Sequence, residues 1–233
     1  MKNIILDTDT KKIYSSNQAD KLVYEFKCEN SSEKRKKTKS GVSAILRNDI
    51  STYFFDYLQN FQIPTFFIKR LSGYELLVRN INFIPITVAV YNYATHDLGK
   101  KFDLKEGIPL QFPVFEFYYL NKGNQRVFIN ETHVFSLGLL TGDEFKIINR
   151  LASKVNAVVK SLCDRRNLIL AKMELEFGRS QNQIVLSSEI SPLTLFFWHL
   201  SDDGKILRDH FVYSGDNIVK SYKEIKDRLS LKS

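Results

Sequence analysis

Charged side chains alternate with apolar ones around residue 174, and their spacing could serve phosphate or metal chemistry. Lys172, Glu174 and Glu176 stand two positions apart, so in a β-strand their side chains project from one face. An ammonium group binds phosphate oxygens, and carboxylates are ligands that Mg²⁺ accepts. With turn residues near position 180, the pattern predicts a β-hairpin, with strands over 168–177 and 183–190, that carries a functional site.

Other single residues have an ordinary structural explanation beside the functional one. Glu176 and Glu189 could be ordinary solvated strand residues, and Lys11 a surface lysine near a turn. His96 and His133 have no carboxylate or second histidine at metal-ligand spacing, which argues against a metal or base role.

The composition predicts an ordinary folded protein. The 233 residues suffice for one large domain or two small lobes, and 43% of them are apolar. No apolar run approaches the ~18 residues of a membrane span, and the N-terminal segment lacks the apolar stretch and cleavage site of a signal peptide. Cys28 and Cys163 form no CxxC motif, which argues against a disulfide framework or a zinc site. We therefore expect a cytoplasmic protein without a membrane partner.

The net charge of +8 raises the question of an anionic partner. The densest basic run is Lys34–Lys39, and it contains no aromatic residue that could stack on a base. A solvated loop explains this run better than a nucleic-acid patch, so we do not expect nucleic-acid binding.

The first third of the chain alternates strand-like runs with turns. Apolar residues recur at helical spacing over 48–61, and this segment stops at Ile63-Pro64. The predicted strands are 22–26, 65–68, 75–78 and 86–91.

The rest of the chain adds longer elements. An aromatic-rich strand is predicted over 114–119, and a final helix over 214–229. Thr141 and Glu144 have the spacing of a capping box, which predicts a helix beginning there. Together these elements predict an α+β fold, in which helices pack on antiparallel sheet. We expect a smaller N-terminal nucleotide lobe, 1–84, and a larger C-terminal lobe, 85–233.

Several short segments resemble, in the same order, motifs of SAICAR synthetase, the ATP-dependent ligase of purine biosynthesis. They are Glu75–Arg79 with Ile84-Pro85, Val114–Tyr119, Ile129–Glu131 with His133, Leu175–Gly178, and Glu189 with Ser191-Pro192 and Trp198. The resemblance extends from Lys11 to Leu229 and implies that family's two-lobed fold, of the ATP-grasp and kinase-like kind.

The resemblance also implies a reaction. The family joins the carboxylate of CAIR, a phosphoribosyl aminoimidazole, to the amine of aspartate, after ATP has phosphorylated that carboxylate. Three anions meet in such a site, so it needs Mg²⁺ and basic side chains. The implied ligands of this chain are therefore Mg-ATP and a phosphoribosyl-imidazole.

Some positions keep the residue of the family motifs, and the resemblance gives them roles. It assigns nucleotide contacts to Lys11, Phe83, Glu176 and Glu189, and substrate contacts to Asn92 and Asp209. Glu176 is also the implied metal ligand, although one carboxylate makes a poor Mg²⁺ site unless the nucleotide supplies further ligands.

Other positions depart from the motifs. The motif's arginine and serine for the CAIR phosphate are Tyr91 and Asp97 here. In the hairpin, Lys172 stands for an aspartate and Glu174 for a lysine, and Ser188 replaces the aspartate expected to bind Mg²⁺. A unit-charge pair at ~4 Å and an effective dielectric of about 20 is worth roughly 4 kcal/mol, so an aspartate beside a phosphate is strongly repulsive.

Two further departures follow in the recognition loop and the first turn. Leu193 and Phe196 stand where the motif has an aspartate and an arginine, so this segment is either core or an exposed apolar patch that marks an interface. Thr8 and Asp9 replace a glycine and a lysine of a phosphate-binding turn.

We therefore expect a divergent family member with impaired or lost catalysis. The alternative is an active SAICAR synthetase or a related carboxylate-amine ligase. A homodimer or another protein partner also remains open.

Overall fold

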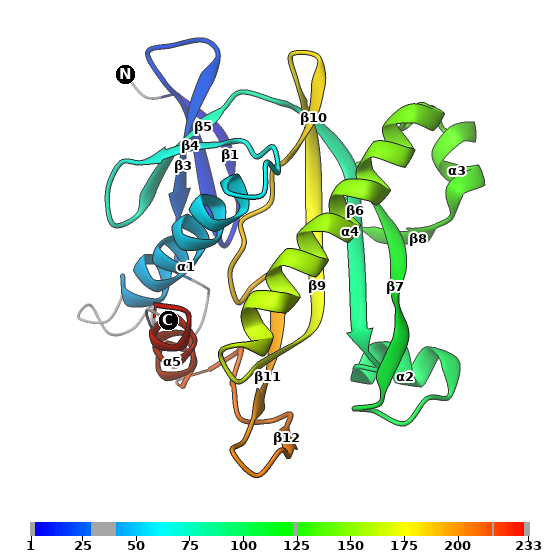
Figure 1. Ribbon diagram of the computed structural model, residues 1–233. Coiled ribbons are helices and arrows are strands. Elements are labelled where there is room, and N and C mark those ends of the chain that lie inside the picture. Colours follow the sequence, from blue (N-terminus) through cyan, green and yellow to red (C-terminus); the bar gives the residue numbers. More distant parts are fainter. Residues whose placement is uncertain (1–2, 29–40, 124, 216, 231–233) are drawn as a thin grey trace.

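The fold is built on two antiparallel sheets, as the sequence predicts (Figure 1). The computed structural model describes residues 3–28, 41–123, 125–215 and 217–230, so the basic run Lys34–Lys39 lies outside the described residues. The first sheet contains β1 (Ile4–Asp7), β2 (Lys11–Ser15), β3 (Lys21–Phe26), β4 (Phe67–Arg70) and β5 (Glu75–Arg79). Its strand order is β1-β2-β3-β5-β4.

The second sheet is larger and starts at β6. Its strands are β6 (Asn82–Tyr93), β7 (Pro109–Leu120), β8 (Arg126–Ile129), β9 (Leu168–Ser180), β10 (Gln183–Leu186), β11 (Leu195–Leu200) and β12 (Ile206–Leu207). The order is β12-β11-β9-β6-β7-β8, and β10 pairs with β9. The lobe boundary predicted after residue 84 falls inside β6.

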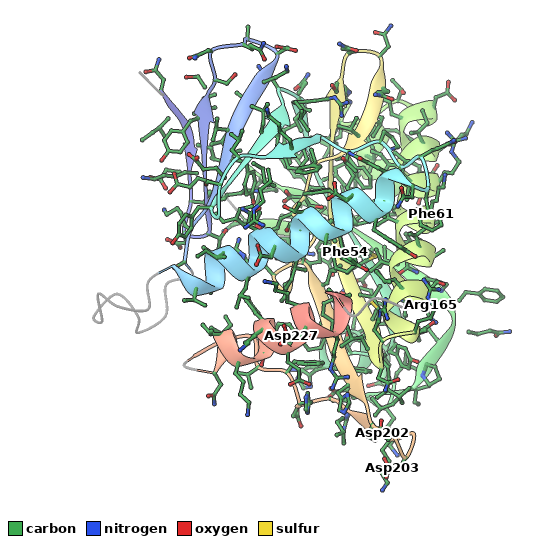
Figure 2. All side chains as sticks on the ribbon, turned by 60° about the vertical axis from the view of Figure 1, so that its left-hand side comes forward. Phe54, Phe61, Arg165, Asp202, Asp203 and Asp227 are labelled. Atoms are coloured by element: carbon green, nitrogen blue, oxygen red, sulfur yellow. The ribbon has the colours of Figure 1, made fainter. Side chains whose placement is uncertain are left out.

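Helices cover these sheets in layers. The helices are α1 (Val42–Gln59), α2 (His96–Phe102), α3 (Glu131–Ser136), α4 (Gly142–Asp164) and α5 (Ile218–Ser230). α4 crosses β9, β10 and β6 on one face of the second sheet, where the main core lies (Figure 1). α1 packs on the first sheet and lies beside α5, which carries Asp227 (Figure 2). No helix in the described part of the chain combines the length and apolarity needed to cross a membrane.

The opposite face of the second sheet is only partly covered. Leu98 of α2 packs there against Ala89 and Tyr91 of β6. Along β9 the buried residues alternate with the half-buried Lys172, Glu174 and Glu176, so these three share this open face, as their spacing predicts. The face that α4 leaves free is therefore the place for a polar site.

The capping box at Thr141 is confirmed. The Glu144 amide donates to the Thr141 hydroxyl at 3.2 Å, and the Thr141 amide donates to the Glu144 carboxylate at 2.9 Å. These two bonds satisfy amides at the start of α4 that have no partner within the helix.

Several predicted boundaries were wrong. The first helix begins at Val42 rather than near residue 48, and the last begins at Ile218 rather than at 214. β6 runs through Pro85 because the ladder with β9 is irregular between Ile84 and Thr87, and such irregular pairing tolerates the missing amide of proline.

The hairpin has a longer first strand, a tighter turn and a shorter second strand than predicted. β9 continues through Gly178 to Ser180, which pairs with Gln183 across a two-residue turn, and Gln181 adopts a positive φ of 53°. Gly178 lies within this strand, and a glycine fits there because a Cβ would overlap the side chain of Ile81. β10 ends at Leu186, so Glu189 lies in an irregular segment and not on a strand.

Candidate functional site

Two adjoining cavities lie on the open face of the second sheet. The interlobe cavity, of about 350 Å³, is lined by Thr10, Lys11, Thr87, Leu120, Arg126, Glu174, Glu176, Ser188, Glu189, Leu193 and Thr194. The acidic cavity, of about 390 Å³, is lined by Thr95, His96, Asp97, Glu106, Lys172, Glu174, Pro192, Leu193, Thr194, Leu195, Phe196 and Tyr213. They share Glu174, Leu193 and Thr194, so both belong to one continuous site.

In the interlobe cavity, Lys11 and Glu176 face each other from the two sheets. The Lys11 amine, at the start of β2, lies 3.7 Å from the Glu176 carboxylate on β9. Both side chains are about a quarter exposed, so an anion or a cation entering the cavity can reach them. The same amine lies 5.8 Å from the ring centre of Tyr24.

Ser188 contributes a hydroxyl to the same cavity. The residue is 2% exposed, and its oxygen has no hydrogen-bond partner among the described residues. A buried hydroxyl without a partner costs free energy, so this atom is suited to a ligand that supplies one.

Glu189 lines the cavity but is held by its own partners. The buried Arg47 guanidinium donates to it at 2.6 and 3.0 Å, and the Tyr24 hydroxyl donates at 2.8 Å. The Ser191 hydroxyl donates to the same carboxylate. Burial raises the pKa of Glu189, but the Arg47 charge and the hydrogen bonds from Arg47, Ser191 and Tyr24 together outweigh it, and the pKa lies below its ordinary value.

Arg47 also connects segments that flank the two sheets. It lies on α1, and it also donates to the carbonyls of Lys27 and Thr10, next to Lys11. The Arg47–Glu189 pair therefore joins α1 and the β2 turn to the segment after β10.

The acidic cavity contains a chain of opposite charges along β9. The Lys172 amine lies 2.9 Å from the Asp97 carboxylate and 3.1 Å from the Glu174 carboxylate. Glu174 is bonded on its other side by Arg126 at 2.8 Å. The local Lys172–Glu174 pair, which the strand spacing allows, therefore forms in the structure.

This chain of charges closes into a ring through β6 and β7. The Tyr91 hydroxyl lies 2.9 Å from Asp97 and 3.2 Å from the buried Glu116. Glu116 also accepts hydrogen bonds from Lys101, at 2.8 and 3.0 Å, and from Tyr118.

Arg126 closes this set of contacts, because its guanidinium lies 4.1 Å from the centre of the aromatic ring of Tyr118. We call this set the charge ring, and its members are Tyr91, Asp97, Lys101, Glu116, Tyr118, Arg126, Lys172 and Glu174. It contains three carboxylates and three basic groups, so its formal charge is zero.

The charges of the ring hold one another ionised. Burial raises the pKa of Asp97, but hydrogen bonds from Thr95 and Lys172 outweigh it, and the pKa falls well below its ordinary range. Burial lowers the pKa of Lys172, but the charge of Glu174 and the bond to Asp97 raise it above its ordinary value. The basic groups of the site are therefore matched by carboxylates of the chain itself.

Comparison with known proteins gives the family. The family model of SAICAR synthetase matches residues 7–228. The chain belongs to the SAICAR synthetase family. It is 32% identical over 231 residues to the phosphoribosylaminoimidazole-succinocarboxamide synthase of Caldanaerobacter subterraneus subsp. tengcongensis, covering 98% of this chain and 97% of that protein. The synthase of Chlorobium phaeobacteroides is also 32% identical, over 220 residues, with 94% and 93% covered.

Solved structures of SAICAR synthetases confirm the family's fold. The Ehrlichia chaffeensis enzyme gives a TM-score of 0.86 at 29% identity, with 99% of this chain and 100% of that one covered. A SAICAR synthetase crystallised with ADP gives 0.84 at 31% identity, with 99% of each chain covered. The two-lobed α+β prediction is therefore correct.

Among the SAICAR synthetase motif residues predicted to bind nucleotide, three line the interlobe cavity. They are Lys11, Glu176 and Glu189. Phe83 lines neither cavity; it is 43% exposed and pairs with Gly178 at the start of β6. The three polar candidates therefore lie together in the interlobe cavity, and Phe83 lies outside it.

The two residues predicted to bind substrate lie outside both cavities. Asn92 is buried, exchanges hydrogen bonds of 2.8 and 2.9 Å with Asn156, and donates to the Leu170 carbonyl. Asp209 is exposed and is not part of either lining. Asn92 faces α4 rather than the open face, which its position in the sequence motif does not reveal.

Sequence reasoning missed Arg47, Glu116 and Arg126. Nothing in the sequence joins Arg47 to Glu189, 142 positions away. The sequence signal that could have identified Glu116 is that it is the one acidic residue within the predicted aromatic-rich strand 114–119. Among the described residues, no group of three His, Cys, Asp or Glu side chains is placed to hold a metal ion.

Proposed function

We propose that this chain binds an adenine nucleotide in the interlobe cavity and that its catalysis of the family ligation is impaired or lost. The nucleotide half of the proposal is supported by Lys11, Glu176 and the partnerless Ser188 hydroxyl. The catalytic half rests on one observation, the charge ring, because a site that joins anionic substrates needs basic groups that its own carboxylates do not neutralise.

The residues of the interlobe cavity fit the phosphates of a nucleotide. Lys11 would neutralise phosphate charge, the Ser188 hydroxyl would donate to a phosphate oxygen, and Glu176 would bind one Mg²⁺ position while phosphates and water fill the others. When bound, Mg-ATP would supply the phosphoryl group that activates a carboxylate. Glu189 would act indirectly, by holding Arg47 and through it the Thr10 carbonyl.

The acidic cavity fits the family's anionic substrates poorly. A phosphate or carboxylate entering there meets Asp97, and the nearest amine, Lys172, is already shared by Asp97 and Glu174. A like-charge pair at ~4 Å and an effective dielectric of about 20 costs roughly 4 kcal/mol, about three decades of affinity.

The decisive experiment supplies CAIR, aspartate and Mg-ATP and follows SAICAR formation at steady state. We expect no turnover above background, while millimolar Mg-ATP raises the melting temperature. Turnover near about 1 s⁻¹, in the usual range of enzymes, would overturn the catalytic half. The absence of any melting shift would overturn the nucleotide half.

A second candidate function is an ATP-dependent ligation of a less anionic substrate. The apolar wall at Leu193 and Phe196 favours it, because this wall lines the cavity beside the nucleotide residues. ATP hydrolysis stimulated by a neutral carboxylate acceptor or an amine, with CAIR inactive, would support this candidate over the first.

A further inference from the structure

We propose that Arg126 binds the terminal phosphate of the nucleotide and thereby sets the preference of the interlobe cavity for ATP over ADP. This inference rests on the proposed function, because it assigns a contact to one phosphate of the nucleotide in that cavity. Three observations carry it: the hydrogen-bond donors of the lining, the reach of the Arg126 side chain, and its place at the junction of the two cavities.

The interlobe cavity presents hydrogen-bond donors that lack acceptors. The Ser188 hydroxyl is 2% exposed and has no partner among the residues that the structure describes. The Lys11 amine makes no hydrogen bond to a described residue, because the Glu176 carboxylate opposite it lies 3.7 Å away. An ionised phosphate chain offers several acceptor oxygens and no donor, so it matches this lining.

Arg126 is the third such donor. Its Nη1 atom donates to the Glu174 carboxylate at 2.8 Å, but within residues 3–28, 41–123, 125–215 and 217–230 its Nε and Nη2 atoms have no acceptor. The side chain lines the cavity and is 40% exposed, so a ligand can reach these two nitrogen atoms. A guanidinium presents its N–H groups as a fork that fits two oxygens of one phosphate.

The ion pair with Glu174 does not prevent this contact. The Lys172 amine lies 3.1 Å from the same carboxylate, so Glu174 keeps a basic partner when a phosphate draws the guanidinium toward itself. The movement therefore exchanges one partner of Arg126 for another and leaves no carboxylate without a cation beside it.

The place of Arg126 points to the terminal phosphate. The side chain extends from β8 past Tyr118 of β7 to Glu174 of β9, a residue that lines both cavities. In phosphoryl transfer the terminal phosphate lies between the rest of the nucleotide and the acceptor. The acidic cavity is the space for an acceptor beside the nucleotide, so the phosphate nearest Glu174 is the terminal one.

The test measures the Kd of Mg-ATP and of Mg-ADP by isothermal titration calorimetry, for the original protein and for Arg126→Gln. ADP lacks the phosphate that Arg126 is proposed to bind. We expect ATP binding to weaken by about tenfold and ADP binding to change by less than about threefold, so the ratio of the ADP Kd to the ATP Kd should fall at least threefold. Arg126→Lys keeps the charge and should recover part of this ratio.

Arg70→Gln is the matched control. Arg70 is 37% exposed and pairs with Asp49 at 2.6 Å. Asp49 also has Lys226 at 2.6 Å, so the change leaves this carboxylate with a lysine, as Arg126→Gln leaves Glu174 with one. Arg70 lines neither cavity, and its loss should change the ratio by less than about twofold.

Glu174→Gln gives an independent test. Removing this carboxylate releases the guanidinium for the phosphate, so Mg-ATP should bind about threefold more tightly. In the Arg126→Gln background the same change should have a smaller effect, because no guanidinium is released. An equal gain in both backgrounds would mean that Glu174 only repels the phosphates, and the role of Arg126 would be wrong.

The outcomes separate this inference from the proposed function. A fall in the ratio of less than threefold in Arg126→Gln, or an equal fall in Arg70→Gln, would overturn the inference. If Mg-ATP raises the melting temperature and the ratio is unchanged in Arg126→Gln, only this inference fails. If neither nucleotide binds the original protein, the nucleotide half of the proposed function fails first, and the role of Arg126 fails with it.

Discussion

The Lys172 amine on β9 donates a 2.9 Å hydrogen bond to the Asp97 carboxylate at the start of α2. The resemblance to the family motifs expects an aspartate at the first of these positions and a serine at the second. In the structure these two residues meet in one contact and pair opposite charges. The same holds for Glu174, whose partners are Lys172 and Arg126. These residues form one connected set of paired charges.

We expect that exchanging the charges of Lys172 and Glu174, with no other change, destabilises the protein. The double change Lys172→Asp with Glu174→Lys keeps an ion pair between the two positions but leaves Asp97 and Arg126 facing like charges. We expect the free energy of unfolding to fall by about 1–3 kcal/mol, measured by urea denaturation.

Adding Asp97→Ser to the double variant supplies the control, because it removes one of the two like-charge contacts. The triple variant should recover part of the lost stability. A double variant as stable as the original protein would show that the outer partners do not hold the pair in place.

The local half of this network could be predicted from the sequence, and the remote half could not. The Lys172–Glu174 pair follows from strand periodicity, which places residues two apart on one face. The partners Asp97 and Arg126 lie 75 positions from Lys172 and 48 positions from Glu174. Their contacts depend on the order β9-β6-β7-β8, which no local pattern encodes.

The same limit explains Asn92. Its position in a motif suggested a substrate contact, but the side chain points to the α4 face and pairs with Asn156, 64 positions later. Successive side chains of a strand point to opposite faces of the sheet, so a shift of one residue would move Asn92 from the α4 face to the open face. The irregular pairing of β6 with β9 after Ile84 sets this register. By contrast, the Thr141–Glu144 box was predictable because all of its atoms come from four consecutive residues.

A second prediction concerns the buried pair that joins the lobes. Arg47→Met should destabilise the protein by about 3–5 kcal/mol, because Glu189 would be left buried without its charged partner. Arg165→Met is the matched control: this arginine is exposed at the end of α4, where it bonds Tyr57 and Ser161 (Figure 2). Its loss should cost at most about 1 kcal/mol, as expected for a surface contact. Equal effects of the two changes in urea denaturation would contradict a special role for Arg47.

A third prediction gives the pH dependence of stability at the start of α4. The hydrogen bond from Arg179 lowers the pKa of Glu144 to about 2, from an ordinary value of 4.5. Because the folded pKa is the lower one, the carboxylate stabilises the native state above pH 4.5, and this contribution is lost as the pH falls from 4.5 toward 2.

Glu144→Gln isolates this effect, since glutamine can still accept the capping hydrogen bond from Thr141. The difference in melting temperature between the two proteins should be largest near neutral pH and should shrink toward pH 2. A difference that stays constant across this range would rule out the ion pair as its cause.

The last prediction concerns the partnerless hydroxyl of the interlobe cavity. Ser188→Ala should leave the free energy of unfolding unchanged or raise it by up to about 1 kcal/mol, because this hydroxyl has no hydrogen bond to lose among the described residues and its burial without a partner costs free energy. Ser188→Asp adds a carboxylate to the cavity that holds Glu176, and hard divalent cations bind oxygen ligands of this kind. Without Mg²⁺, the new carboxylate should repel ATP. With Mg²⁺, it should tighten ATP binding about tenfold, a gain of about 1.4 kcal/mol. Calorimetric titration of ATP with Mg²⁺ and with EDTA measures both effects. Tighter binding in EDTA, or weaker binding in both conditions, would show that Ser188 does not face the metal-bound phosphates.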